Sequence, residues 1–138
     1  MAEALILDSE AVNALAHAAE RGKLAHRARA IATVAFERRA LVRIPAPVLA
    51  EVCRGPRFDA AVHRLIGERG IGVVDLTRSI AQRAGALLAK AKLSSAHAID
   101  AFVVATALEF ETAVIATGDQ ADMQRLAARF RTVKVFEI

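Results

Sequence analysis

Four carboxylates in this sequence occupy positions suited to chemistry: Asp8, Glu51, Asp100 and Asp119. Asp8 directly follows the short apolar run 4–7, and Asp119 follows a second apolar run after a two-residue turn. Carboxylate oxygens are the ligands that Mg²⁺ and Mn²⁺ prefer in proteins. Carboxylates that converge also repel one another and raise one another's pKa unless a cation lies among them. If these four converge, they form a site for a divalent ion that can activate a water molecule.

Asp100 is the acid that an ordinary structural role explains least. It lies in the segment 96–108, which is almost entirely apolar, and a helix that is apolar almost all round is usually buried. An ionised carboxylate that is buried without a partner costs many kcal/mol, or it takes up a proton. One candidate partner is His97, three residues earlier on the same helix face. The alternative is that Asp100 faces the carboxyl edge of a sheet and meets a cation.

The other three acids also have ordinary explanations. An Asp in the turn after a strand is often a helix N-cap, which covers Asp8 and Asp119. Glu51 follows a Pro-containing loop, where an acid is usually solvated. Because its neighbours on both sides are apolar, we include it among the candidate metal ligands. Cys53, the one cysteine, is interpreted as core packing. No Cys/His set with zinc spacing is present, so oxygen ligands and Mg²⁺ or Mn²⁺ are expected.

The elements that must position these acids follow from an alternation of short apolar runs and longer amphipathic stretches. The expected strands are 4–7, 41–44, 71–76, 113–116 and 132–136, and the expected helices are 10–20, 23–39, 48–54, 58–68, 77–92, 98–110 and 120–130. This alternation predicts one α/β domain over residues 1–138, with a largely parallel sheet between two layers of helices. Ligands of such sheets bind beyond the carboxyl ends of the strands, where Asp8 and Asp119 lie.

The distribution of charge suggests a polyanionic partner. The chain carries 19 Lys and Arg against 15 Asp and Glu, and residues 21–43 hold seven basic residues and one acid. A second basic group closes the chain and comprises Arg125, Arg129, Arg131 and Lys134. Blocks of one sign favour binding to phosphates, although a solvated helix face gives the same pattern.

Composition also bounds the location of the protein. The first residues lack the basic segment and long apolar stretch of a signal peptide, and no apolar run approaches the roughly 20 residues that span a bilayer. One cysteine allows no intramolecular disulfide, which fits a reducing compartment. We therefore expect a soluble cytoplasmic protein with no membrane partner.

Four segments, taken together, resemble the motifs of one known family. They are residues 5–15 (LILDSEAVNAL), 47–52 (PVLAEV), 98–108 (AIDAFVVATAL) and 116–123 (ATGDQADM). Their order and spacing resemble those of PIN domains over essentially the whole chain, and a stand-alone chain of this size resembles the VapC toxins of type II toxin–antitoxin modules. The resemblance implies a three-layer α/β/α fold with a five-stranded sheet, Mg²⁺-dependent cleavage of RNA, a homodimer, and inhibition by a cognate VapB-like antitoxin.

The resemblance also implies roles for individual residues. Asp8 and Asp100 would bind Mg²⁺ directly, with Mn²⁺ as a substitute. Glu51 and Asp119 would bind through water, complete a second metal site or orient the nucleophile. Accessory roles would fall to Ser9, Thr117 and Asp122. The basic segment 21–43, and not the resemblance, suggests Arg38 and Arg39 for binding RNA phosphates. The family often has Ser or Thr directly before its fourth acid, whereas Gly118 stands there in this sequence.

Two alternatives compete with this interpretation. The first is a phosphoacceptor receiver domain, another doubly wound α/β fold, in which Asp75 would accept phosphate with Thr117 and Lys134 as partners. Receivers need paired acids after the first strand and a Lys just after the last one, and this sequence offers neither. The second is a catalytically silent PIN-like RNA-binding module, although all four acids are present.

Overall fold

The computed structural model describes residues 2–138, apart from the side chain of residue 69. Its sheet has five strands, all parallel, in the order β3-β2-β1-β4-β5. The strands are β1 (Glu3–Leu7), β2 (Leu41–Pro45), β3 (Gly72–Val74), β4 (Thr112–Thr117) and β5 (Val133–Glu137). The predicted α/β class with a five-stranded sheet is therefore confirmed, and the sheet is parallel throughout.

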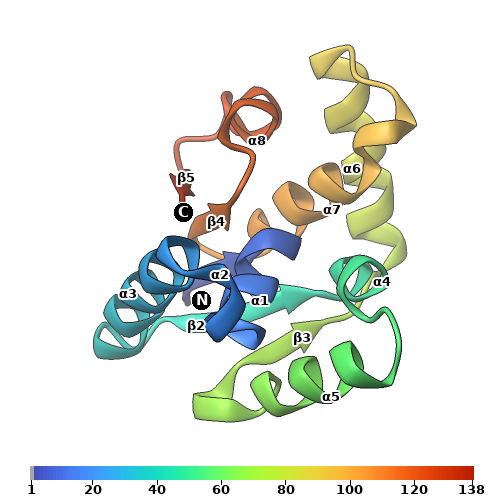
Figure 1. Cartoon of the computed structure of the whole chain (residues 1–138). Coiled ribbons are helices and arrows are strands. Elements are labelled where there is room, and N and C mark those ends of the chain that lie inside the picture. The colour runs from blue at the N-terminus through green and yellow to red at the C-terminus, as the bar shows by residue number, and fades with distance from the viewer. Residues whose placement is uncertain (1) are drawn as a thin grey trace.

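Two layers of helices cover the sheet (Figure 1). One layer contains α1 (Ser9–Ala16), α2 (Ala18–Arg21), α3 (Lys23–Glu37), α4 (Leu49–Val52) and α5 (Pro56–Leu65). The other contains α6 (Arg78–Ala91), α7 (Ala98–Ala107) and α8 (Gln120–Ala127). Short 3₁₀ turns join some of them: η1 (Ala46–Val48), η2 (Glu68–Gly70) and η3 (Ser95–His97). The chain thus forms the expected three-layer α/β/α arrangement.

The central strand and α7 supply much of the core. Residues Leu5, Ile6 and Leu7 of β1 are at most 2% exposed because helices cover both faces of the sheet there. In α7 every residue from Val103 to Ala107 is buried, as its all-round apolar sequence predicts. This burial fixes the position of the α7 N-terminus, which carries Asp100 at the edge of the sheet.

The observed elements differ from the expected ones at several boundaries. The helix predicted over 10–20 breaks at His17, whose backbone leaves the helical region, and the ring of His17 packs edge-on against Phe58 with centroids 5.3 Å apart. The strand expected over 71–76 contains only Gly72–Val74, because β3 is an edge strand that pairs with β2 alone. Thr77 caps α6 as predicted, its side chain accepting from the backbone N–H of Ile80.

The strand order contradicts the receiver alternative. In flavodoxin-like sheets, which include receivers, the order is 2-1-3-4-5, so the first strand lies between the second and third. Here β1 lies between β2 and β4. Asp75 follows an edge strand and is exposed, and Lys134 lies inside β5, so neither has the place that phosphoacceptor chemistry requires.

Candidate active site

The acids gather where the chain reverses its direction of travel across the sheet. From β1 the chain moves to β2 and β3 on one side, and from β4 it moves to β5 on the other. A crevice opens at the carboxyl ends of such neighbouring strands because their connections leave toward opposite sides. Asp8 follows β1 directly, Asp119 follows β4, and Asp100 lies in the first turn of α7 beside them.

Asp8 is the most enclosed of these acids, with 6% of its surface exposed. Its Oδ1 accepts a hydrogen bond from the backbone N–H of Ala11 at 2.9 Å, so it caps α1. Its Oδ2 accepts from the N–H of Gly118 at 3.3 Å, and the side chain of Thr117 adds another hydrogen bond. Burial raises the pKa of Asp8, and these hydrogen bonds oppose that shift. The N-cap role is therefore real, and the same carboxylate also joins β1 to the end of β4.

The turn after β4 explains why glycine precedes Asp119. A Cβ atom at position 118 would lie 2.5 Å from Cγ and 2.8 Å from Cβ of Glu10, which is too close for any side chain there. The hydroxyl is instead supplied one residue earlier. Thr117 is fully buried, and its Oγ1 accepts from the backbone N–H of Asp119 at 2.9 Å. Asp119 then caps α8 by accepting from the N–H of Asp122 at 3.4 Å.

Asp100 lacks a partner. Among residues 2–138 its half-buried carboxylate forms no hydrogen bond or ion pair. Burial and, to a smaller extent, the negative charges of four other acids together raise its pKa to about 6; the acids are Asp8, Asp119, Asp122 and Glu51. The crevice therefore carries more negative charge than its own residues compensate, which is the electrostatic condition that a bound cation relieves.

Glu51 approaches the centre from the opposite layer of helices. It lies on α4 with an exposed side chain, and the hydroxyl of Ser9 on α1 donates a hydrogen bond to its Oε1. Its charge acts on Asp100, so it belongs to the same electrostatic group. The structure thus places Ser9 as the residue that holds Glu51.

His97 and Asp122 lie beside Asp100 and contact each other. His97 does not pair with Asp100; its Nδ1 lies 3.4 Å from Oδ2 of Asp122. Asp122 is half-buried and faces this group, although its place on α8 was also compatible with solvent. The spacing puts His97 on the same helix face as Asp100, and Asp122 one turn after Asp119, but the contact between His97 and Asp122 comes from the packing of α7 against α8.

The predicted RNA-binding arginines lie away from these acids. Arg38 and Arg39 follow α3, and Arg38 pairs with Glu3 at 3.1 Å, at the start of β1. Asp8 lies beyond the other end of that five-residue strand, about 16 Å along the sheet at 3.3 Å per residue. At the amino edge Arg38 meets the basic group at the end of the chain, where it lines a hollow of about 290 Å³ together with Arg131 and Lys134.

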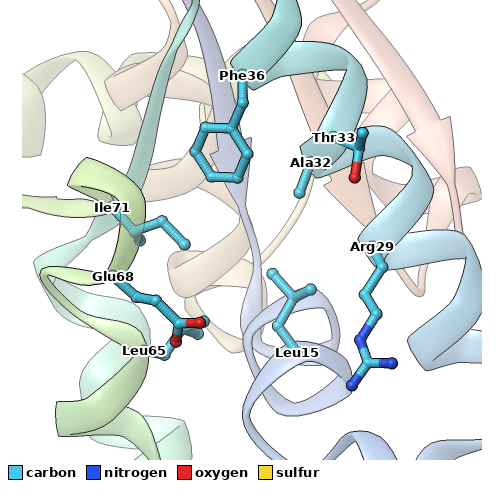
Figure 2. Close-up of a pocket in the computed structure, with 8 residues that line it drawn as sticks. All are labelled: Leu15, Arg29, Ala32, Thr33, Phe36, Leu65, Glu68 and Ile71. Atoms are coloured by element: carbon cyan, nitrogen blue, oxygen red, sulfur yellow. The ribbon is translucent and has the colours of Figure 1, made fainter.

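A second hollow, of about 300 Å³, also lies apart from the acids (Figure 2). It opens between α1, α3 and the segment around η2, and the apolar part of its walls includes Leu15, Phe36, Leu65 and Ile71. Arg29 and Glu68 extend from opposite sides of it (Figure 2). The hollow lies toward the amino ends of the strands and contains no group of carboxylates, so it is not the catalytic candidate.

The donor set at the carboxyl edge fits a hard divalent cation. Asp8, Glu51, Asp100 and Asp119 offer only oxygen ligands, and Mg²⁺ uses one or two carboxylates together with water. The N-termini of α1, α7 and α8 also converge there, and their partial positive charge offsets only part of the carboxylate charge. The residues present therefore fit the metal.

Fold and site together define a three-layer α/β protein with a carboxylate centre at the switch point of a parallel sheet. The sequence matches the family model described as "PIN domain" over residues 5–129, and the chain belongs to the PIN-domain family.

Solved structures of the same fold come from toxin–antitoxin systems. A structure described as a toxin–antitoxin complex from Klebsiella pneumoniae has a TM-score of 0.64 and 21% identity, covering 97% of this chain and 99% of that one. VapBC2 from Rickettsia felis, bound to a DNA fragment from its promoter, has a TM-score of 0.60 and 13% identity, with 98% of each chain covered. No curated protein matches the sequence. Over residues 2–138 no helix has the length and apolar character needed to cross a membrane.

Proposed function

We propose that this chain is a metal-dependent ribonuclease that acts as the toxin of a type II toxin–antitoxin pair. The observation that carries the proposal is the Asp100 carboxylate. It is half-buried and has no partner among residues 2–138, and its burial together with the charges of four other acids raises its pKa to about 6. PIN domains are generally nucleases, and hydrolysis of a phosphodiester commonly uses a cation held by carboxylates in this way.

Each acid has a role in this proposal. Asp8 and Asp100 hold the ion directly, since both are more enclosed than Glu51 and Asp119. Glu51 and Asp119 act through water, complete a second metal site with RNA or orient the nucleophile. Mg²⁺ is the expected ion, with Mn²⁺ as a substitute; once bound, it supplies positive charge to the scissile phosphate and lowers the pKa of the attacking water.

Two hydroxyl side chains are positioning residues in this scheme. Thr117 bonds Asp8 and accepts from the backbone of Asp119, so it fixes two of the acids relative to each other. Ser9 donates to Glu51 and holds that carboxylate toward the crevice. Such preorganisation lowers the free energy of the transition state because the groups need not reorient during the reaction.

The proposed toxin role rests on the similarity of this chain to proteins in toxin–antitoxin structures. A ribonuclease that is free in the cytoplasm damages its own cell, so we expect a cognate VapB-like antitoxin that blocks the acidic crevice. An arginine guanidinium can form paired hydrogen bonds with these carboxylates, and its positive charge compensates their negative charge as a metal ion would. Inhibition by such an arginine should therefore compete in part with Mg²⁺.

RNA is expected to contact both edges of the sheet. Arg38 and Arg39 would bind phosphates at the amino edge, about 16 Å from the acids along β1. A bound strand must therefore run across one side of the molecule, or the partner subunit of a homodimer must bring the two edges together. The homodimer and the cytoplasmic location belong to the same proposal.

The direct test is cleavage of structured RNA by the purified, antitoxin-free chain. Mg²⁺ or Mn²⁺ should support cleavage and EDTA should stop it. Asp8→Asn should abolish cleavage while leaving the circular dichroism spectrum unchanged. Asp75→Asn is the matched control, because Asp75 is an exposed acid that also follows a strand but lies outside the crevice.

Four results would contradict the proposal in different ways. Cleavage that survives EDTA would show that the reaction needs no metal. Full activity of Asp8→Asn would show that the site is assigned to the wrong residues. RNA binding without cleavage under all metal conditions would favour the silent RNA-binding alternative. Expression of the wild-type chain alone should arrest bacterial growth; harmless expression of soluble protein would remove the toxin role and leave the nuclease.

A further inference from the structure

A nitrogen donor stands beside the acidic crevice. One ring nitrogen of His97 and one carboxylate oxygen each of Asp100 and Asp122 lie within 4.8 Å of one another, and all three residues are half-buried. In the described part of the chain this is the one set of three or more such side chains that converges so closely. Ligand atoms on a single ion lie about 3–4.2 Å apart because each bond to the ion is about 2.1 Å long. Small movements of these side chains would bring them onto one ion.

The three side chains come from two helix starts that pack together. His97 directly precedes α7, Asp100 lies in the first turn of α7, and Asp122 lies in the first turn of α8. Because the buried stretch of α7 fixes that helix against the sheet, their approach is set by the fold.

The donors are also free for a ligand. Asp100 has no hydrogen bond or ion pair within residues 2–138. The His97 ring forms no hydrogen bond in the same range, and its 3.4 Å contact with Asp122 is an ion pair only when the ring is protonated. A neutral imidazole and two carboxylates left without stronger partners form a ready ligand set.

This set is distinct from the oxygen-only set of the proposed nuclease centre. Asp8, Glu51 and Asp119 fall outside the group that converges within 4.8 Å. Asp100 is the residue shared by the two. Asp100 therefore belongs to a group of carboxylates and also to a set that contains an imidazole.

An imidazole ligand changes which cation is preferred. Carboxylates suit Mg²⁺, Ca²⁺ and Mn²⁺, whereas imidazole suits first-row transition metals, and Mn²⁺ accepts both kinds of ligand. We infer that His97, Asp100 and Asp122 form a second cation pocket that binds a divalent first-row transition-metal ion in preference to Mg²⁺. The inference rests on the metal-binding part of the proposed function, and it makes His97 the residue that sets metal preference.

The experiment uses Mn²⁺ as the probe because its bound form is paramagnetic. Pulsed EPR of the full chain with Mn²⁺ should show ¹⁴N modulation from a directly bound imidazole, and labelling with ¹⁵N-histidine should replace that modulation. His97→Gln should remove it. The dissociation constant for Mn²⁺ should rise about tenfold in this variant and that for Mg²⁺ should change less than about twofold. Exposed His63 on α5 gives the matched control: His63→Gln should change neither.

The outcomes separate this inference from the proposed function. Mn²⁺ that binds the wild-type chain without ¹⁴N modulation would overturn the role of His97, and metal-dependent RNA cleavage would be unaffected by that result. Equal loss of Mn²⁺ and Mg²⁺ affinity in His97→Gln would also overturn it, because His97 would then act without selecting the metal. Asp8→Asn should lose cleavage yet keep the ¹⁴N signal; loss of the signal would show a single site. A wild-type chain that binds no Mn²⁺ would overturn this inference, whereas the proposed function would fall only if Mg²⁺ also failed to support cleavage.

Discussion

The backbone N–H of Gly118 donates a hydrogen bond to Oδ2 of Asp8 across 3.3 Å, so the end of β4 is tied to the end of β1 through a carboxylate of the candidate active site. The two residues are 110 positions apart in sequence. Closure of this contact depends on the adjacent turn, in which position 118 leaves no space for a side chain beside Glu10. Fold stability and the geometry of the site are therefore coupled at one glycine.

Gly118→Ala should destabilise the protein by about 1–3 kcal/mol, the usual range for forcing an extra carbon into a packed position. The new Cβ would lie 2.5 Å from Cγ of Glu10, so either the turn or the start of α1 must shift. The measurement is the free energy of unfolding in urea, compared with the wild type. RNA cleavage by the same variant should fall, because the shift weakens the hydrogen bond to Asp8.

Glu10→Ala provides the control for that prediction. Removing Cγ of Glu10 eliminates the closest contact but leaves Cβ, which would still be 2.8 Å from the added carbon. The double variant should therefore recover part of the stability lost in Gly118→Ala. Independent, additive losses in the two variants would show that the clash with Glu10 is not the cause.

Thr117→Val should weaken cleavage more than Thr117→Ser. Valine has nearly the same shape as threonine but no hydroxyl, so Asp8 loses a hydrogen bond and the N–H of Asp119 loses its acceptor. An unsatisfied buried donor costs about 1–3 kcal/mol of stability. Serine keeps the hydroxyl and loses only a methyl group. Equal single-turnover cleavage rates for the two variants would contradict the positioning role of Thr117.

The raised pKa of Asp100 predicts how stability depends on pH in the metal-free protein. Its pKa is about 6 in the folded chain, against an ordinary value of 3.8. The folded state thus binds this proton more tightly than the unfolded state, so the contribution is fully present below about pH 4 and is lost as the pH rises through 6. Because the carboxylate is only half-buried and is screened by solvent, we expect a loss of about 1–2 kcal/mol.

Asp100→Asn isolates that contribution, because asparagine does not titrate. The difference in unfolding free energy between the variant and the wild type should grow in favour of the variant between pH 4.5 and pH 7.5, measured in urea with EDTA present. Millimolar Mg²⁺ should stabilise the wild type at pH 7.5 and leave Asp100→Asn nearly unchanged. A difference that is constant across this pH range would mean that the other acids do not strain Asp100.

Much of the fold follows from local sequence patterns. The apolar run 4–7 predicts a strand buried on both faces, and β1 occupies the centre of the sheet. The break of the first helix at His17 could not be predicted in this way. It accompanies the packing of the His17 ring against Phe58 on α5, a contact between residues 41 positions apart, and the surrounding alanine-rich sequence favours an unbroken helix.

The candidate site was predictable to a different degree for different residues. Asp8 follows an apolar strand directly and Asp119 follows one after a short turn, so their place at the carboxyl edge is a consequence of strand order. The approach of His97 to Asp122 depends on how α7 packs against α8, which no local pattern encodes. The distance of Arg38 from the acids follows from its position just before β2, which puts it at the amino edge.

Neutralising Arg38 and Arg39 together should flatten the dependence of RNA affinity on salt. Each phosphate contact that is lost reduces the slope of log K against log salt by about 0.7–0.9. Cleavage positions should stay the same, because both residues lie at the opposite edge from the acids. The measurement is filter binding of RNA to Arg38→Gln/Arg39→Gln between about 50 and 200 mM salt.

Arg83→Gln/Lys90→Gln is the matched control for this pair. Both are exposed basic residues of α6 that line a hollow on the α6–α8 layer and belong to neither basic group. An unchanged slope in the Arg38 and Arg39 variant, or the same change in both double variants, would show that the basic segment is a solvated helix face and does not bind RNA specifically.

The central claim is that a cation bound at the Asp100 carboxylate performs RNA cleavage. Its most direct test is the single-turnover rate of cleavage by Asp100→Asn relative to the wild type, at saturating Mg²⁺ and with both proteins shown to be folded by circular dichroism. The proposal predicts a rate at least about a hundredfold lower in Asp100→Asn, because that variant removes a metal ligand from the reacting centre. A rate within about threefold of the wild type, at the same cleavage positions, would contradict it.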